Sequence, residues 1–396
     1  MLFAIPLHEC RLPASEGLCQ QVLHHSLQWN SRISPCDQGV LTDGYGFYVE
    51  ASKKMDWSDT LGPCHARRAW ASMLAHAHCR QPHIGTGAMG GRGCKVDRLM
   101  CKIETGLAKG DNIMARFGMH LSIAGGFTNA TSRAVELGCD CFQIFSRNPR
   151  TLRAKPIDRG AADAFRSAVA QAGLEPVVVH VNYLVNVASP KDETYEASVS
   201  ALTDELLRAE ILGADYLVLH PGNHLGSGVE AGSERIARAI DRAYEDSGSS
   251  VMISLENMAG AGTEIGVSFG ELRSICDLSE RGKSLGICFD TCHAYGAGYD
   301  VSTDRGLDRT LGELDAEIGL DRLMFVHAND SKGQLGAARD RHEHIGEGLI
   351  GVAGFRAILR RKELRDLPFI LETPVDSPDD QVRDLAALRA AAGEGY

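Results

Sequence analysis

The feature of the chain that most constrains its fold is a series of short apolar runs beyond residue 117, each separated from the next by a stretch with helical periodicity. Uninterrupted apolar runs of this length are typical of parallel strands that are covered on both faces. The runs span residues 118–122, 141–146, 176–180, 216–220, 251–256, 285–290, 323–327 and 368–372. Eight such strand–helix units predict an α/β fold, the (β/α)8 TIM barrel. A doubly wound open sheet is the alternative, because the number of strands alone does not establish that the sheet closes.

The joints between the predicted helices and the strands that follow them repeat one pattern. An apolar or small residue is followed by glycine, another apolar or small residue and an acidic residue. The glycines of these joints are Gly138, Gly173, Gly213 and Gly319. Because glycine adopts the left-handed conformation that ends many helices at little steric cost, we expect each joint to be a helix end followed by a short turn.

The chain changes character near residue 114. All three tryptophans lie before this point, and the hydrophobic periodicity there is poor. We predict that residues 114–396 form the barrel domain. We interpret residues 1–113 as an irregular N-terminal extension that is poorly ordered or results from a mis-called start, with Met114 as the natural beginning of the protein. A genuine accessory domain is the alternative.

Composition excludes several classes of protein. No apolar run approaches the ~18 residues that a membrane-spanning helix needs, and the N-terminus lacks the basic region of a signal peptide. The twelve cysteines show no regular disulfide framework. We therefore expect a cytoplasmic protein without a membrane partner, and a monomer. The net charge of −11, taken alone, argues against a nucleic-acid partner.

Most of the predicted strands end in a side chain that is able to bind a metal ion. These side chains are His180, His220, Glu256, Asp290, His327 and Glu372. The C-terminal ends of the strands form the active-site mouth in this fold, so we expect the six to meet there. Each alone is explained by ordinary hydrogen bonding or solvation, but a succession of them is not, because charged groups rarely cluster without a partner. Three further candidates follow on the loops, namely His293, Asp340 and His342.

The combined set contains five histidines and four carboxylates. Nitrogen and oxygen ligands without thiolates favour catalytic zinc over manganese or iron. Because a zinc ion takes about three or four protein ligands, this set predicts about two or three ions. Metal ions spaced ~3.5–4 Å apart stabilise both the attacking and the leaving oxygen of a phosphoryl displacement, so such a cluster suits that class of reaction.

Six segments surround these candidates. They are His180-Val-Asn-Tyr183-Leu184-Val-Asn186, His220-Pro-Gly-Asn-His224, Leu255-Glu256-Asn257, Gly286-Ile-Cys-Phe-Asp290-Thr-Cys-His293, Val326-His327-Ala-Asn-Asp330-Ser-Lys332 followed by Asp340-Arg-His342, and Leu371-Glu372-Thr373. Together they resemble the signatures of the endonuclease IV family of abasic-site DNA repair enzymes. The resemblance covers about residues 117–374, and residues 1–113 have no counterpart in it.

The resemblance implies three bound zinc ions, with manganese or iron as alternatives at some sites. The implied ligands are His180, His220 and Glu256 for the first ion, Glu256, Asp290, His327 and Glu372 for the second, and His293, Asp340 and His342 for the third. Glu256 is then the implied catalytic residue, because it bridges two ions that share a hydroxide. The hydroxide would attack the phosphorus 5′ to an abasic deoxyribose, leaving a 3′-hydroxyl and a 5′-deoxyribose phosphate.

The partner implied by the resemblance is double-stranded DNA that contains abasic sites or blocked 3′ ends. Arg150, Tyr183 and Leu184 are the implied DNA-binding residues, which would enter the base stack at the lesion. An abasic nucleotide has no base to unpair, so flipping it out of the duplex costs little. Leu152 departs from the family pattern, which often has an aromatic residue there, so we expect contacts to the damaged strand to differ in detail.

A basic cluster follows the second predicted strand and bears on the unfavourable net charge. It consists of Arg147, Arg150, Arg153 and Lys155. We expect these side chains to line the cleft, where a local positive field matters more than the net charge of the whole chain. An ordinary solvated loop is the alternative.

Two other functions remain alternatives. A metal-dependent sugar isomerase or epimerase of similar barrel fold also uses carboxylates and histidines at strand ends. Such an enzyme has no evident use for the additional Asp340 and His342. A non-catalytic metal-binding protein would not need so complete a set of ligands.

Overall fold

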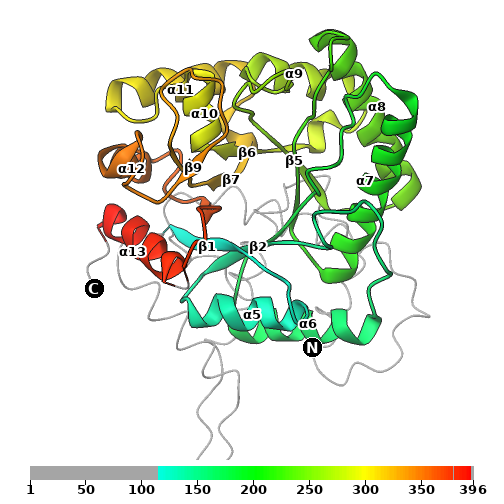
Figure 1. The fold of residues 1–396 in the computed structure, drawn as a ribbon, viewed down its shortest axis with the longest axis horizontal. Helices are drawn as coiled ribbons and strands as arrows, with labels where there is room; N and C mark the ends of the chain where they lie inside the picture. The colour runs from blue at the N-terminus through cyan, green and yellow to red at the C-terminus, as the bar shows by residue number, and fades with distance from the viewer. Residues whose placement is uncertain (1–114, 378, 394–396) are drawn as a thin grey trace, which may run out of the picture. The chain divides into compact units, whose positions relative to one another are not determined.

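The strands of the barrel follow one another around a closed ring in a computed structural model that describes residues 115–377 and 379–393 (Figure 1). They are β1 (Arg116–Leu121), β2 (Cys141–Phe145), β3 (Val177–His180), β4 (Tyr216–Leu219), β5 (Met252–Glu256), β6 (Gly286–Asp290), β7 (Leu323–His327) and β10 (Pro368–Leu371). All eight predicted runs are therefore strands, with bounds that differ from the prediction by two residues at most. The expectations for residues 1–113 lie outside the described residues and stay predictions.

Pairing between the first and last of these strands closes the sheet. Gly118 of β1 pairs with Cys141 of β2 on one side and with Ile370 of β10 on the other, and every pair around the ring is parallel. The predicted TIM barrel is confirmed, and the open sheet is wrong. The contact between β1 and β2 is close enough to require glycine, because a Cβ at position 118 would lie 2.1 Å from the carbonyl oxygen of Cys141.

The helices surround this ring (Figure 1). They are α5 (Phe127–Glu136), α6 (Arg159–Ala172), α7 (Asp192–Leu212), α8 (Val229–Ser247), α9 (Phe269–Leu278), α10 (Thr291–Ala297), α11 (Asp304–Glu317), α12 (Gly351–Arg360) and α13 (Asp380–Ala392). As predicted, α6 and α7 end at Gly173 and Gly213, whose φ angles of 70° and 69° are left-handed. Within the described ranges, no helix is long and apolar enough to cross a membrane.

Two layers of inward-facing side chains fill the barrel. The lower layer is an apolar cluster of Cys141, Val178, Val218, Cys288, Phe325 and Ile370. Side chains alternate between the two faces of a strand, so the residue two positions further along faces the same way. Applied to these six residues, and to Gly118 and Ser254, which pair with Cys141 and Val218 at the same level, that rule gives the upper layer as His120, Gln143, His180, His220, Glu256, Asp290, His327 and Glu372. The polar residues therefore lie on top of an apolar floor, at the mouth of the barrel.

A buried ion pair fastens the loop after β2 to α7. Arg147 Nε lies 2.6 Å from Glu205 Oε1, with both side chains at most 2% exposed. Arg147 also contacts Asp204 at 2.7 Å, and Arg208 donates from Nε to Ser146 Oγ at 2.8 Å. Burial raises the pKa of Glu205, although Arg147 acts in the opposite direction. Arg147 therefore supports the loop from beneath, and the expectation that it lines the cleft is wrong.

We expect Glu205→Ala to lower the free energy of unfolding by about 3–5 kcal/mol, because it leaves the buried guanidinium of Arg147 without its buried partner and with only the half-exposed Asp204. Glu196→Ala on the same helix is the matched control: Glu196 pairs with Arg242 at 2.9 Å, but its side chain is 57% exposed. The control should cost less than about 1 kcal/mol. Urea denaturation of both variants measures the difference, and equal losses would contradict the prediction.

Candidate metal centre

The structure brings all nine predicted ligands together at the mouth of the barrel. Among the groups whose potential ligand atoms lie within 4.8 Å of one another, three consist of these residues alone. These three groups are His180, His220 and Glu256; Glu256, Asp290, His327 and Glu372; and His293, Asp340 and His342. The membership of these groups matches the division that the family resemblance implies, while the role of each residue as a ligand stays a prediction.

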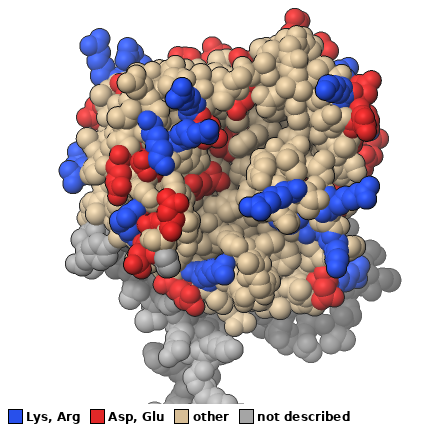
Figure 2. All heavy atoms as spheres, viewed as in Figure 1, with Lys and Arg blue, Asp and Glu red and all other residues tan. Residues whose placement is uncertain are grey.

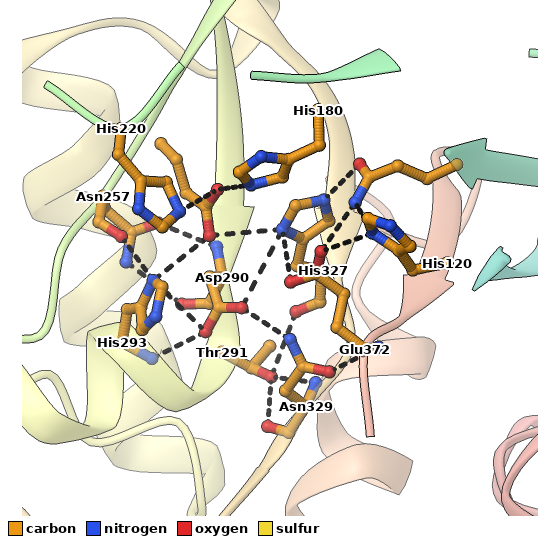
Figure 3. Close-up of polar contacts among 12 residues, drawn as sticks. His120, His180, His220, Asn257, Asp290, Thr291, His293, His327, Asn329 and Glu372 are labelled. Carbon is orange, nitrogen blue, oxygen red and sulfur yellow. Dashed lines mark hydrogen bonds and ion pairs between the residues drawn. The ribbon is translucent and has the colours of Figure 1, made fainter. Parts of the chain in front are cut away.

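Glu256 stands at the centre of the cluster, and its side chain is fully buried. Its Oε2 lies 3.1 Å from His220 Nε2 and 3.5 Å from His180 Nε2. Its Oε1 lies 3.2 Å from His327 Nδ1 and 3.1 Å from His293 Nδ1. One carboxylate thus faces histidines of all three groups, an arrangement suited to a ligand shared between two ions. Figure 3 shows the imidazole rings turned toward one another around this centre.

Backbone carbonyls determine which nitrogen each of three histidines offers to the centre. Nδ1 of His180 lies 2.7 Å from Val181 O, Nδ1 of His293 lies 3.0 Å from Asn257 O, and Nδ1 of His342 lies 3.0 Å from Glu372 O. A carbonyl oxygen only accepts hydrogen bonds, so the nitrogen that faces it carries the hydrogen. The opposite nitrogen of each neutral ring then presents a lone pair, as metal-bound histidines do.

Those lone pairs are directed at carboxylates instead of donors. Nε2 of His293 lies 3.4 Å from Asp340 Oδ1, and Nε2 of His342 lies 3.3 Å from the same oxygen. Among the residues that the structure describes, neither of these nitrogens has a hydrogen-bond partner, and neither does Oε2 of Glu256. Acceptors that face acceptors in a buried place require a cation between them, so the donor set fits divalent metal ions.

The electrostatics of the cluster lead to the same requirement. Burial lowers the pKa of His293, but the charge of Asp290 and the neighbouring carboxylates of Asp340 and Glu256 outweigh it, and the pKa lies well above its ordinary value. Burial raises the pKa of Asp340, but His293 and His342 outweigh it and lower the pKa to about 2. Crowded carboxylates therefore favour positive charge on the imidazoles, and metal ions that bind here would displace protons from them.

Two asparagines that the sequence analysis did not single out hold the carboxylates in place. Asn257 spans from β5 to β6, where its Nδ2 donates to Asp290 O at 3.0 Å and its Oδ1 accepts from Asp290 N at 2.8 Å. Asn329 donates from Nδ2 to Asp290 Oδ2 at 2.6 Å and accepts from Glu372 N at 2.8 Å. Both asparagines follow a predicted ligand within two residues, and that position was the available signal.

A small ribbon, β8 (Asp330–Ser331) with β9 (His342–Glu343), positions the third group. The ribbon pairs Ser331 with His342 and so directs that histidine into the mouth. The buried carboxylate of Asp330 accepts hydrogen bonds of 2.8–3.2 Å from the backbone nitrogens of Ser331, Gly346, Gly348, Ile350 and Gly351. A single side chain thus shapes the loop that follows His342.

Two thiols lie near the centre, because Cys288 is within 4.8 Å of ligand atoms of Glu256 and His327, and Cys292 is within 4.8 Å of those of Asp290 and His342. Cys288 and Cys292 flank Asp290, and both are free and buried. Burial is the largest cause that raises the pKa of each thiol to about 12. Both thiols are therefore neutral near pH 7, as the sequence suggested, and the nitrogen and oxygen donors remain the candidate ligands.

The residues expected to bind DNA lie on two neighbouring loops of the mouth. Tyr183 and Leu184 follow β3 and are 56% and 43% exposed, and Arg150, after β2, is exposed as well. Asn182 connects the two loops, because its Nδ2 donates to Thr151 O at 2.9 Å and its Oδ1 accepts from Leu184 N at 2.8 Å. The face drawn in Figure 2 is hollowed at its centre, with acidic side chains inside the hollow and Lys and Arg side chains around its edge.

Comparison with known proteins identifies the family. The model of the family described as xylose isomerase-like TIM barrel matches residues 132–391. A probable endonuclease 4 from Methanoculleus marisnigri is 52% identical over 281 residues, which cover 71% of this chain and 100% of that relative. The crystal structure of endonuclease IV from Thermus thermophilus is 38% identical with a TM-score of 0.64, and the match covers 71% of this chain and 100% of that one.

A similar fold also occurs in a D-tagatose 3-epimerase-like protein, with a TM-score of 0.54 over 70% of this chain and 97% of that one. Its sequence identity of 22% shows a common barrel and nothing about activity. The match to endonuclease 4 proteins, by contrast, extends over their full length at much higher identity. The chain therefore belongs to the endonuclease IV family, within the xylose isomerase-like TIM barrels.

Proposed function

We propose that the protein is a metal-dependent DNA repair endonuclease that hydrolyses the phosphodiester bond on the 5′ side of an abasic nucleotide. The products would be a 3′-hydroxyl and a 5′-deoxyribose phosphate. The observation that carries the proposal is the set of nine nitrogen and oxygen donors in three groups that meet around Glu256. Membership in the endonuclease IV family supports DNA as the substrate.

We assign three zinc ions to the three groups, with manganese or iron as the other ions that such donors accept. Bound divalent ions would make hydroxide available near neutral pH and neutralise the charge that develops on the phosphate oxygens. Glu256, shared between two groups, would keep those groups at a fixed separation. Asp340 is 41% exposed and His220 is 28% exposed, so the centre is open to a substrate from the mouth.

The rim residues would select the substrate. Tyr183 and Leu184 are large and exposed, and Asn182 ties the backbone of Leu184 to the neighbouring loop, so they suit insertion into a base stack beside a lesion. An abasic nucleotide leaves the stack at low cost, because it has no base to unpair or unstack. Arg150, on the adjoining loop, would contact the phosphate backbone.

Removal of metal should abolish cleavage. We expect a chelator to reduce nicking of a duplex oligonucleotide with one abasic site by at least about 1,000-fold, because the ions supply several kcal/mol of transition-state stabilisation. Added zinc should restore it, and a polymerase should extend the nicked strand from its 3′-hydroxyl. Cleavage that resists the chelator would contradict the proposal. Epimerisation of a ketose without nicking would favour the sugar epimerase instead.

Truncation of the exposed rim residues should weaken substrate binding. We expect Tyr183→Ala and Leu184→Ala each to raise KM for the abasic duplex about 10-fold, because an inserted side chain contributes roughly 1–3 kcal/mol of stacking. Metal content should not change. Val135→Ala is the control, because Val135 is 54% exposed in the last turn of α5, which leads to the opposite end of the barrel. An unchanged KM in both rim variants would rule out their role.

Arg150 should account for about one phosphate contact. We expect Arg150→Ala to weaken binding to duplexes of any sequence and to reduce the slope of log Kd against log salt concentration by about 1. Lys362→Ala provides the control, because this side chain is 81% exposed on the segment that leads into β10, away from the mouth. An identical salt slope in wild type and Arg150→Ala would show that the arginine does not touch a phosphate.

A further inference from the structure

Gln143 is a polar side chain in the middle of β2, fully buried between Phe142 and Ile144 of the same strand. Its carboxamide reaches three side chains of the polar layer. Nε2 lies 2.6 Å from Glu372 Oε1 and 2.9 Å from His120 Nδ1, and Oε1 lies 2.9 Å from His327 Nε2. Figure 3 shows His120, His327 and Glu372 gathered on this side of the centre.

The partners of the carboxamide determine which way it points. The carboxylate of Glu372 accepts hydrogen bonds and donates none, so the amide nitrogen of Gln143 has to face it. The amide oxygen is then left for His327, and because that oxygen only accepts, Nε2 of His327 carries the hydrogen. An amide flipped the other way would place two acceptors 2.6 Å apart.

The consequence for His327 is that its other nitrogen offers a lone pair to the centre. Nδ1 lies 3.2 Å from Glu256 Oε1, 3.3 Å from Glu372 Oε2 and 3.9 Å from Asp290 Oδ2. These are the members of the second ligand group. An imidazole whose lone pair is surrounded by three carboxylates is ready to bind a cation at that position.

His327 differs from three of the other candidate histidine ligands in what orients it. His180, His293 and His342 are oriented by backbone carbonyls, which no substitution removes. His327 is oriented by the side chain of Gln143, and the same amide also holds Glu372. We infer that Gln143 is the positioning residue of the second ligand group: it selects the nitrogen with which His327 binds metal and it orients Glu372. The inference rests on the proposed metal-binding role of these groups.

We expect loss of Gln143 to affect the binding of one metal ion and not the other two. Gln143 contacts two members of the second group, and within the described part of the chain no hydrogen bond joins it to the first or third group. Loss of its amide should therefore weaken one metal ion out of three. Residues that orient metal ligands typically contribute about 10–100-fold to metal affinity.

Gln143→Met in the full chain tests this, because methionine has a similar length and no amide. Wild type and variant would be loaded with zinc, titrated with a chelator and analysed for zinc per chain. We expect the variant to lose one equivalent of zinc at a free chelator concentration about 10–100-fold lower than wild type requires, with the other equivalents retained. In histidine-labelled protein, the nitrogen resonances of His327 should change, while those of His180, His293 and His342 should not.

Val178→Ala is the matched control, because Val178 pairs with Gln143 in register and belongs to the apolar floor of the barrel. This control should lower thermal stability without changing zinc release. If zinc release from Gln143→Met equals that of wild type, or if all three equivalents weaken together, the inference is overturned. Gln143→Leu serves if the methionine variant does not fold, with the same expectations.

The failure of this inference can be told apart from failure of the proposed function. Wild-type protein that retains no zinc, or that binds zinc and does not nick abasic DNA, contradicts the proposed function. Wild-type protein that binds zinc and nicks DNA, together with a Gln143→Met variant that releases zinc as wild type does, contradicts only the role of Gln143.

Discussion

The mouth of the barrel depends on one electrostatic constraint, which is that several carboxylates are held close together with little access to water. Glu256 and Asp290 are fully buried, and the groups that face Glu256 most closely are neutral or protonated imidazoles. Such a cluster is stable only with compensating positive charge. The surrounding amides and carbonyls are neutral, so they orient the rings and carboxylates without supplying that charge. The positive charge has to come from protons or from metal ions.

The barrel could be predicted from the sequence because parallel strands covered on both faces are continuous apolar runs, and all eight runs are strands. Closure required the pairing of β1 with β10, which no run shows by itself. The ribbon of β8 and β9 could not be predicted, because two residues per strand are too few to show alternation. Its shape depends instead on the backbone hydrogen bonds that Asp330 accepts.

Six of the nine candidate ligands were visible because each ends an apolar run, and a succession of such residues is not explained by ordinary hydrogen bonding or solvation. Gln143 was not visible, because a polar residue in the middle of a strand gives no sign of facing a ligand. Arg147 was misjudged for a related reason: a basic residue in a loop looks solvated until its partner Glu205, distant in sequence, is located. The DNA-binding roles of Arg150, Tyr183 and Leu184 stay predictions.

The apolar floor formed by residues such as Val178, Phe325 and Ile370 affects how water and ions reach the metal centre. Since these side chains are fully buried and close the barrel below the polar layer, water and ions reach the centre from the rim in the part of the chain that the structure describes. A duplex seated across that rim would cover the same entrance. Exchange of ions with bulk solvent would then be confined to the intervals between one bound duplex and the next, and the charge of the centre would stay constant during each reaction.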